Sequence, residues 1–358
     1  MSAVLAAWDR FWLAPASLRR LALFRIALAL LVLQDVIGTA RVVLRDAAAL
    51  DAGDPNLWWS PILLFQVLGW PPLGLAAAEM LYSAMLVLPV LVALGIGTRV
   101  TCFALALGFL YWTGLIYGFG KPHHDKVALA FALMALWVGP AGRVYSIDAW
   151  LRRRRRGGEP AEGDLAPWAA LPLRFTQISA VFGYAFAGWS KLAISGLAWA
   201  NGYSLQGIML GHDNVWAELL TRRVELCALL SVGALALQST FPLILFFPRL
   251  RWLYLPGAVA FHVGTWHTMD TGPYITLWFT LLAFLPLEQV PRWFHAELSS
   301  RSPWRVARAL LSTGVPVALS VYVFAVHSPV VAALLLLAST TYLLRRNRTY
   351  GARANSSG

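Results

Sequence analysis

One lysine near the end of a long apolar stretch stands out for its possible chemistry. Lys191 lies in the segment from Phe186 to Leu192, and it is one of only three lysines in a chain with 29 Lys and Arg residues. An ionisable side chain inside a membrane is costly, so it is a functional hypothesis by default. Lysine, unlike arginine, can give up its proton inside a protein. Lys191 is therefore a candidate base.

The depth of Lys191 leaves two interpretations open. It lies roughly 6 Å below the predicted outer end of its helix, at about 1.5 Å per residue. Its four-carbon stem could extend to the headgroups as an interfacial anchor, or the ammonium could face the bundle interior and serve as a base. The residues one and two turns earlier on the same face are Gly183, Tyr184, Ala187 and Gly188. Small residues there suit either close helix packing or a cavity beside the lysine.

The histidines do not predict a metal site. His262 and His267 share one predicted helix, but a separation of five residues places them about 140° apart around its axis. A metal site would need His123, His124 or His212 to converge with one of them, and their spacing does not require it. A lone histidine is more often structural than catalytic. His262 is the exception, because burial at its depth is expensive.

Four consecutive polar residues open another apolar stretch. They are His123, His124, Asp125 and Lys126. Such a cluster marks either the rim of a cavity or simply the edge of a membrane span. Both interpretations place these side chains on the same side of the membrane as Lys191.

The composition predicts that membrane helices position these groups. The chain has 358 residues, of which 59% are hydrophobic and 13% charged, and its mean hydropathy is +0.62. An ordinary soluble domain is roughly 45–50% apolar and 25% charged. We therefore expect an all-α, polytopic bundle of about ten transmembrane helices, each near the roughly 20 residues that cross a bilayer. The predicted spans are 18–38, 76–96, 99–119, 124–140, 173–195, 224–247, 252–269, 272–290, 305–326 and 329–344.

The basic residues predict the orientation of the bundle. Short cytoplasmic loops collect Lys and Arg, and most arginines fall in alternate loops, including the run from Arg152 to Arg156. Both termini are then cytoplasmic, and Lys191 faces the exterior. The net charge of +12 follows from these loops, so we expect contact with the lipid bilayer and no nucleic-acid partner. Cys102 and Cys227 fall in or at predicted spans and are expected to be buried thiols, not a disulfide.

Four stretches carry a family resemblance. The first is Leu23-Phe24-Arg25-Ile26, the second Gln177 with Ala187-Gly188-Trp189-Ser190-Lys191-Leu192, Trp199 and Gly202-Tyr203-Ser204-Leu205, the third Phe261-His262 with Met269, and the fourth His124-Asp125 through Ser146-Ile147-Asp148. Over roughly residues 15 to 290 the sequence resembles the HTTM family, the bacterial relatives of vitamin K-dependent γ-carboxylase. The Ala-Gly-x-x-Lys-Leu element with its trailing Gly-Tyr-Ser is the most specific of these matches.

The resemblance implies a site. The lysine that matches Lys191 in the carboxylase is thought to deprotonate vitamin K hydroquinone, and His124 and His262 match regions of functional histidines. On this basis we expect Lys191, His124 and His262 to be catalytic. We expect Tyr184, Gly188, Tyr203, Asp125 and His267 to bind a reduced quinone such as menaquinol, with no metal. The placement of His124 needs a shift of one residue, which leaves Asp125 as an alternative.

The departures from the carboxylase pattern bear on function. Ser190 stands where the carboxylase has the first of two lysines. We also expect no large lumenal domain like that of the carboxylase after the last predicted span. We expect residues 1–290 to form the HTTM, carboxylase-like transmembrane domain. Residues 291–358 would form an amphipathic linker, a further helical hairpin and a short basic cytoplasmic tail.

Two functions of different classes remain open for a multi-pass protein of a bacterial inner membrane. One is an enzyme that binds a reduced quinone and uses Lys191 as a base facing the exterior. The other is a non-catalytic protein that binds a lipid or helps to mature or export a secreted peptide, with Lys191 as a counter-ion or anchor. Lys191→Arg separates them, because arginine keeps the charge but cannot be the base. The sequence leaves the oligomeric state open.

Overall fold

A computed structural model describes residues 3–120, 126–155, 165–271 and 281–289 of the chain. The chain divides into two units, Met1–Arg292 and Trp293–Gly358, and the second lies wholly outside the described residues. The predicted spans 305–326 and 329–344, the basic tail and most of 272–290 also lie outside them. The same holds for His124 and Asp125.

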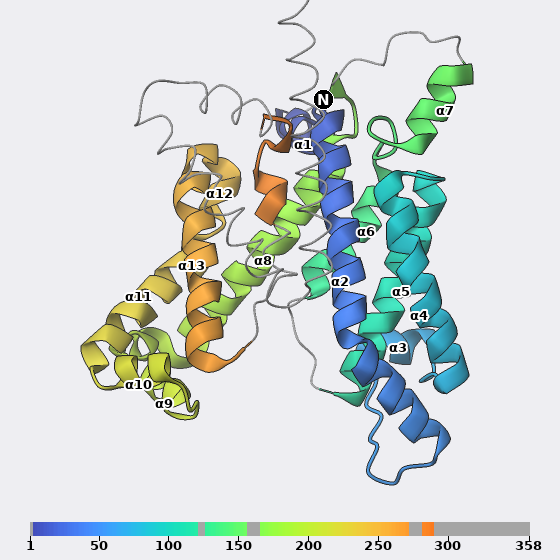
Figure 1. Cartoon of the computed structure of the whole chain (residues 1–358). Helices are drawn as coiled ribbons and strands as arrows, with labels where there is room; N and C mark the ends of the chain where they lie inside the picture. Colours follow the sequence, from blue (N-terminus) through green and yellow to red (C-terminus); the bar gives the residue numbers. More distant parts are fainter. Residues whose placement is uncertain (1–2, 121–125, 156–164, 272–280, 290–358) are drawn as a thin grey trace, which may run out of the picture. The chain divides into compact units, whose positions relative to one another are not determined.

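The described residues form thirteen α-helices and one two-stranded sheet (Figure 1). The helices are α1 (Ala3–Leu13), α2 (Leu18–Asp51), α3 (Leu63–Leu68), α4 (Leu75–Leu94), α5 (Thr98–Phe119), α6 (Val127–Val138), α7 (Ile147–Arg155), α8 (Ala170–Ser195), α9 (Tyr203–Leu210), α10 (Val215–Thr221), α11 (Val224–Thr240), α12 (Leu243–Phe246) and α13 (Arg251–Met269). Short 3-10 helices are η2 (Gly196–Asn201), η3 (Pro248–Leu250), η4 (Leu282–Phe284) and η5 (Leu287–Gln289). Strands β1 (Ala16–Ser17) and β2 (Leu165–Ala166) pair antiparallel. The all-α expectation is confirmed.

Helices α2, α4, α5 and α6 form what we call the first helix group. Helix α2 packs against α4 and α5, which also pack against each other, and α5 packs against α6. The largest apolar core lies here, and its members include Phe24, Phe109 and Trp112, all fully buried. Burial of large aromatic and aliphatic side chains supplies most of the favourable free energy of such contacts in the protein interior.

Helices α8, α11 and α13 form the second helix group. Helix α8 contacts α6 on one side and α11 on the other, and α11 also contacts α13 (Figure 1). The apolar clusters are smaller here: one surrounds Phe241, and another joins Met209, Ala217 and Cys227 beside α9 and α10. The second helix group therefore has less apolar core than the first.

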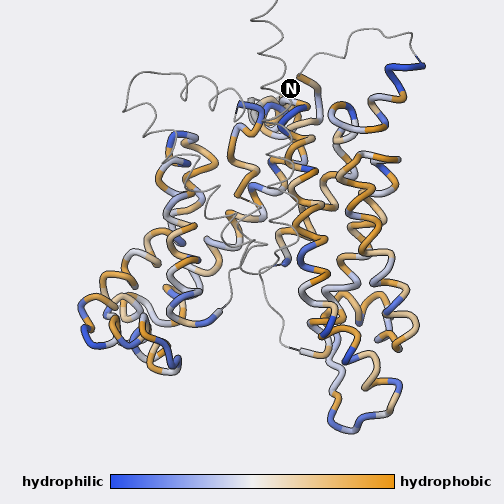
Figure 2. Tube along the Cα trace, in the orientation of Figure 1, coloured by the Kyte–Doolittle hydropathy of each residue, from blue (hydrophilic) through white to orange (hydrophobic). Residues whose placement is uncertain are grey.

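Three of the described helices are long and apolar enough to cross a membrane: α2, α4 and α5. Figure 2 shows hydrophobic residues along these helices and hydrophilic residues at the end of α7. Helices α6 and α11 are apolar but shorter, with 12 and 17 residues. Seven predicted spans, from 18–38 to 252–269, each overlap one of α2, α4, α5, α6, α8, α11 and α13. Membrane helices are thus supported, but the full set of ten spans is not established.

The first predicted span ends too early. We expected it to stop near residue 38, but α2 has 34 residues and continues to Asp51. Its last three turns are amphipathic, because Ala40, Val43 and Ala47 are buried while Arg41 and Arg45 are exposed. Polar residues end an apolar stretch without ending a helix.

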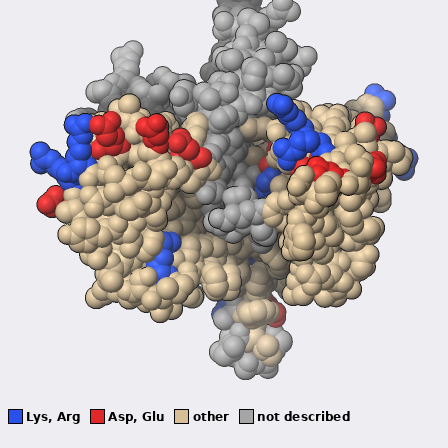
Figure 3. All heavy atoms as spheres, turned by 90° about the horizontal axis from the view of Figure 1, so that it is seen from below, with Lys and Arg blue, Asp and Glu red and all other residues tan. Residues whose placement is uncertain are grey.

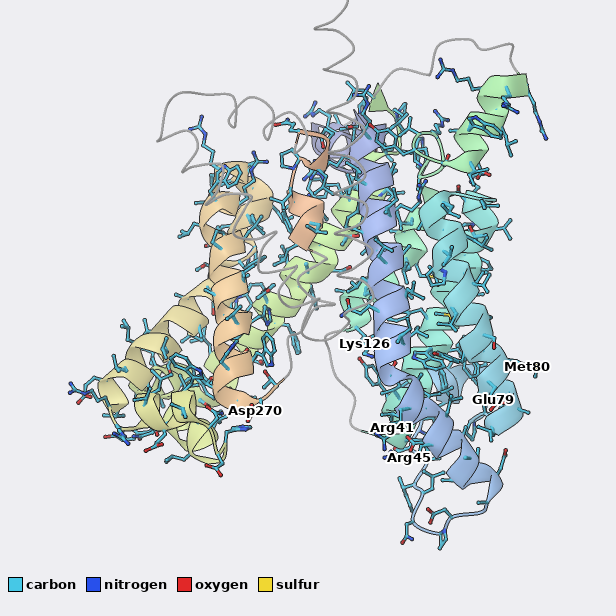
Figure 4. All side chains as sticks on the ribbon, viewed as in Figure 1. Arg41, Arg45, Glu79, Met80, Lys126 and Asp270 are labelled. Carbon is cyan, nitrogen blue, oxygen red and sulfur yellow. The ribbon has the colours of Figure 1, made fainter. Side chains whose placement is uncertain are left out.

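Charged side chains in the first helix group have fixed partners. The fully buried Arg25 donates to the carbonyl oxygens of Ala93 at 3.2 Å, Ala141 at 2.6 Å and Tyr145 at 2.6 Å. Lys126 Nζ lies 2.8 Å from Asp35 Oδ2, with the two side chains only 9% and 11% exposed. Figure 4 shows Lys126 beside α2. A buried charge is costly unless it has partners. Because these partners come from other segments, both cations link separate parts of the chain.

Candidate functional site

Helix α8 positions the residues around Lys191. Tyr184, Ala187, Gly188 and Lys191 recur at helical spacing within its 26 residues, so they share one side of the helix. Tyr184 and Gly188 are buried. This side meets α11, which contributes Gln238.

Lys191 is half-buried, and its hydrogen-bond and ring partners among the described residues are all neutral groups. Its Nζ donates to Gln238 Oε1 at 3.0 Å and to the carbonyl oxygen of Ala187 at 3.2 Å. It also lies 5.3 Å from the centre of the Trp199 ring, a distance that allows a cation–π interaction. The side chain is therefore held between α8, α11 and η2 without an ion pair among the described residues.

A cavity of about 410 Å³ lies between α6, α8, α11 and α13. Its wall is mostly apolar, and its polar members are Ser179, Tyr184, Gln238 and His262. Phe131 and Phe182 also line it and are 48% and 64% exposed. An apolar molecule could therefore enter past these two rings. Lys191 does not line the cavity itself, but its partner Gln238 does.

Tyr184 and His262 form the polar pair of this cavity. The Tyr184 hydroxyl lies 2.7 Å from His262 Nε2, and both residues are buried. The Tyr184 ring stacks on Phe241 at a centroid distance of 4.1 Å, and the His262 ring meets the edge of Phe261 at 5.1 Å. Packing on both sides fixes the orientation of the pair, which a binding site requires.

Two glycines allow the helices around Lys191 to approach closely. A Cβ on Gly188 would lie 2.6 Å from the backbone nitrogen of Ser239, so any larger residue would push α8 from α11. Gly202 has a φ of +88°, and a Cβ added to it would lie 2.4 Å from the backbone nitrogen of Ala228. Only glycine fits both demands at position 202 without strain. The Gly-Tyr-Ser segment thus holds the turn against α11.

The structure brings some expected site residues together and places others elsewhere. Tyr184 and His262 line the cavity, whereas Gly188 packs against α11 and Lys191 contacts the lining residue Gln238. Tyr203 does not line the cavity: it is 64% exposed at the start of α9. His267 does not line it either, and its Nδ1 lies 2.9 Å from the carbonyl oxygen of Val263. In the described part of the chain, no group of three or more His, Cys, Asp or Glu side chains could hold a metal.

Gln238 is the functional candidate that the sequence analysis missed. It is buried, lines the cavity and contacts Lys191. A glutamine in the apolar stretch 224–247 is the signal that could have found it, since polar side chains at membrane depth usually face the bundle interior. Phe131, Phe182 and Phe261 gave no such signal, because phenylalanine is ordinary in a membrane helix.

The face on which α9 and α10 lie carries charges of both signs. Figure 3 shows basic and acidic side chains on this side, separated by wide areas without charge. Arg222 and Glu218 form an ion pair here, and His212 Nδ1 lies 3.9 Å from Asp270 Oδ2. Surface pairs of this kind contribute little to stability, typically about 0–1 kcal/mol.

Comparison with known families identifies the chain. The HTTM domain model matches residues 14–288, which is most of the chain. The chain belongs to the HTTM family. No curated protein and no solved structure matches it. The HTTM match spans the first and second helix groups, so the cavity and Lys191 both lie within the matched domain. HTTM is the carboxylase-like transmembrane family.

Proposed function

We propose that this HTTM protein binds a reduced quinone in the cavity between α6, α8, α11 and α13 and that Lys191 acts as a base toward it. One observation carries the proposal. The same cavity is bounded by the Tyr184–His262 pair and by Gln238, the residue that Lys191 contacts. Polar groups from α8, α11 and α13 on an otherwise apolar wall suit a flat apolar molecule that carries two oxygens.

The residues fit a quinol in size and character. Ligand sites are commonly about 300–1,000 Å³ and mostly apolar with a few placed polar groups, and this cavity of about 410 Å³ meets that description. Phe131, Phe182 and Phe261 offer aromatic surface for a fused ring. The exposed Phe131 and Phe182 would let the apolar tail reach lipid. A bound quinol supplies two hydroxyl groups and an electron pair that oxygen can accept.

Each polar residue then has a role. Tyr184 and His262 would hydrogen-bond one quinol oxygen and fix the ring. Gln238 would bond the other oxygen and keep Lys191 beside it. Lys191 contacts Gln238 but does not line the cavity, so one bridging water would carry the hydroxyl proton to its neutral Nζ. The neutral partners Gln238 and Ala187 do not oppose loss of the lysine's charge as a carboxylate would.

The site is proposed to face the exterior of a bacterial inner membrane. The position of a basic segment supports this orientation. Arg152 to Arg155 lie in α7, and α7 lies at the opposite end of the helices from α9 and α10 (Figure 1). Cytoplasmic loops collect such residues. Lys191 lies near the other end of α8.

Oxygen consumption tests the role of Lys191. Purified protein in lipid nanodiscs receives menahydroquinone, and oxygen uptake and quinone epoxide are measured against protein-free nanodiscs. We expect wild-type activity and a loss of at least about 100-fold in Lys191→Ala, since a positioned base contributes roughly 10²–10⁴-fold. Lys191→Arg should be equally inactive, because arginine stays protonated. Equal rates in wild type and Lys191→Ala would refute the assigned role.

Cavity filling tests binding separately from chemistry. Gly183 lines the cavity, and nothing lies within 4 Å of a Cβ added there. Gly183→Leu should fill the space and weaken menahydroquinone binding at least tenfold. Gly233→Leu is the matched control, because Gly233 lies on α11 outside the lining and also has open space around it. Retained binding in Gly183→Leu would place the ligand elsewhere.

A second function is supported by the contacts of Lys191 itself. Its interactions with Ala187, Gln238 and Trp199 link α8, α11 and η2, as expected of a structural anchor in a non-catalytic protein that binds lipid or assists a secreted peptide. In that case Lys191→Arg would preserve both folding and cellular function. The arginine variant therefore separates the two proposals, since the enzyme requires a base and the anchor requires only a cation.

A further inference from the structure

A second cavity lies at the other end of α8 and has a different character. It has a volume of about 370 Å³ and is lined by three arginines, Arg20 of α2, Arg174 of α8 and Arg251 of α13, together with Glu288 of η5. Arg174 and Lys191 are roughly 25 Å apart along α8 at about 1.5 Å per residue. The arginine cavity is therefore separate from the quinol site.

The positive charges of this cavity exceed its negative charge. Arg20, Arg174 and Arg251 are accompanied by one carboxylate, that of Glu288, and Arg174 and Arg251 lie close enough to Arg20 to repel its charge. None of the three arginines forms an ion pair with a carboxylate in the described part of the chain. Glu288 can balance only one of them.

The guanidinium groups retain hydrogen-bonding capacity. Arg20 donates to the carbonyl oxygen of Ala283 at 2.5 Å, and Arg174 donates to Gln177 Oε1 at 3.0 Å. The Nε atoms of Arg20 and Arg251 are buried and have no hydrogen-bond partner among the described residues. Each guanidinium has five N–H donors, and a buried donor without an acceptor costs about 1–3 kcal/mol. An acceptor in the cavity would remove that cost.

Phosphate is the acceptor that this arrangement fits. Guanidinium groups bind phosphate oxygens with paired, charge-assisted hydrogen bonds, and several arginines around one space match the tetrahedral oxygens. Leu173, Ile244 and Phe284 supply an apolar wall beside the arginines. Phe246 and Phe247, next to this wall in the chain, are 73% and 59% exposed, so an acyl chain could lie against them.

We propose that the cavity formed by Arg20, Arg174 and Arg251 binds a phosphate group. Two sources have this chemistry: the headgroup of an anionic phospholipid and a soluble phosphate. In either case the bound group joins α2, α8 and α13, which meet at this cavity. The ligand would therefore stabilise the folded protein as well as occupy a site.

Thermal unfolding of the full chain in detergent tests the proposal and its two sources. The additives are phosphatidylglycerol, zwitterionic phosphatidylcholine, and inorganic phosphate against chloride at equal ionic strength. A larger upward shift with phosphatidylglycerol than with phosphatidylcholine identifies the lipid, and a shift with phosphate alone identifies the soluble ligand. Native mass spectrometry then counts the phosphatidylglycerol retained. If neither phosphate source raises the unfolding temperature, the proposal is wrong.

Two neighbouring arginines provide the matched variants. Arg251 lines the cavity, whereas Arg249 is exposed and does not line it. Arg251→Gln should bind the phosphate ligand about tenfold more weakly, the change expected when one charge-assisted hydrogen bond is lost, and Arg249→Gln should bind as wild type does. Equal losses in both variants would indicate general surface attraction and overturn the site. If Arg251→Gln does not fold, Arg174→Gln gives the same test, because Arg174 also lines the cavity.

Discussion

Two lysines of this protein show how its helix groups differ. In the first helix group, Lys126 Nζ lies 2.8 Å from the carboxylate of Asp35, and both side chains are nearly buried. In the second, Lys191 is half-buried and contacts only an amide oxygen, a backbone carbonyl and an aromatic ring. One lysine is neutralised by a partner of opposite charge. The other is held in place without being neutralised.

The surroundings of the two lysines differ in the same way. The first helix group has the large apolar core, and its fully buried Arg25 is tied to three carbonyl oxygens. The second has small apolar clusters, and it shares with α6 of the first group a cavity whose polar residues Tyr184, Gln238 and His262 all come from the second. Dense packing with paired charges gives rigidity. A cavity with placed polar groups gives a binding site. The first helix group is thus the scaffold on which the second presents its site.

Removing each lysine should give the largest contrast. Lys126→Met leaves Asp35 buried without its lysine, and loss of one partner from a buried pair costs about 3–5 kcal/mol. Lys191→Met breaks only bonds to neutral oxygens and should cost about 1 kcal/mol. Unfolding free energies in mixed micelles measure both. The double variant Lys126→Met/Asp35→Leu should recover most of the loss, and equal costs for the two single lysine variants would contradict the comparison.

Helix spacing in the second group gives the next largest effect. Gly188→Ala places a methyl group 2.6 Å from the backbone of Ser239, and such overpacking typically costs about 1–3 kcal/mol. It should also move Gln238 away from Lys191 and lower quinol turnover. Gly183→Ala is the control for stability on the same helix, because nothing lies within 4 Å of its added Cβ, and Gly233→Ala on α11, outside the cavity lining, is the control for turnover. A neutral Gly188→Ala would mean that α8 and α11 are not held at this distance.

A hydroxyl group tests the cavity more finely. Tyr184→Phe removes the bond to His262 and should cost about 0.5–1.5 kcal/mol in unfolding free energy. Tyr254→Phe is matched to it, since Tyr254 donates to Thr240 Oγ1 at 2.7 Å within the same helix group but does not line the cavity. We expect similar stability losses in both variants, measured by thermal unfolding. Only Tyr184→Phe should weaken menahydroquinone binding, and equal binding by the two would remove Tyr184 from the site.

The sequence predicts the helices of this protein better than it predicts their neighbours. Hydropathy located seven of the described helices, the first of them α2. It ended the α2 span at residue 38, whereas the helix continues to Asp51, because a helix can continue after its apolar stretch ends. Spacing along α8 placed Tyr184, Gly188 and Lys191 on one side. Periodicity works within a helix because 3.6 residues per turn fixes which side chains share a face.

Contacts between helices were beyond that reasoning. Gln238 reaches Lys191 from a helix 47 residues away along the chain, and Tyr184 meets His262 across 78 residues. Neither spacing has a local signal. Tyr203 and His267 were expected to bind the quinone, and neither lines the cavity: Tyr203 is exposed, and His267 Nδ1 lies 2.9 Å from the carbonyl oxygen of Val263. A motif records which residues recur, and packing decides which of them meet.

The smallest predicted effect is a loss of folding stability at low pH that arises from Asp148, whose carboxylate binds the first turn of α5 in the first helix group. Burial alone would raise the pKa of Asp148, but hydrogen bonds from Gly97 N at 2.9 Å and from Thr98 N and Oγ1, both at 2.7 Å, outweigh it and hold the pKa below its usual value. A carboxylate of this kind stabilises the folded state above its unfolded pKa, near 3.9. That contribution is lost as the pH falls through the lower folded value.

The unfolding temperature of wild type and Asp148→Asn should therefore differ by a constant amount above about pH 5 and converge at lower pH. Thr98→Val removes one of the three donors, so it should raise the folded pKa of Asp148 and shrink the stabilisation that is lost in acid. Asp148 accepts these bonds at the first turn of α5, far in the chain from Gln238 and His262. Menahydroquinone binding at pH 7 should accordingly be the same in wild type and Asp148→Asn. A binding defect in Asp148→Asn would show that the cavity of the second helix group depends on this end of the first, and the division between scaffold and site would then fail.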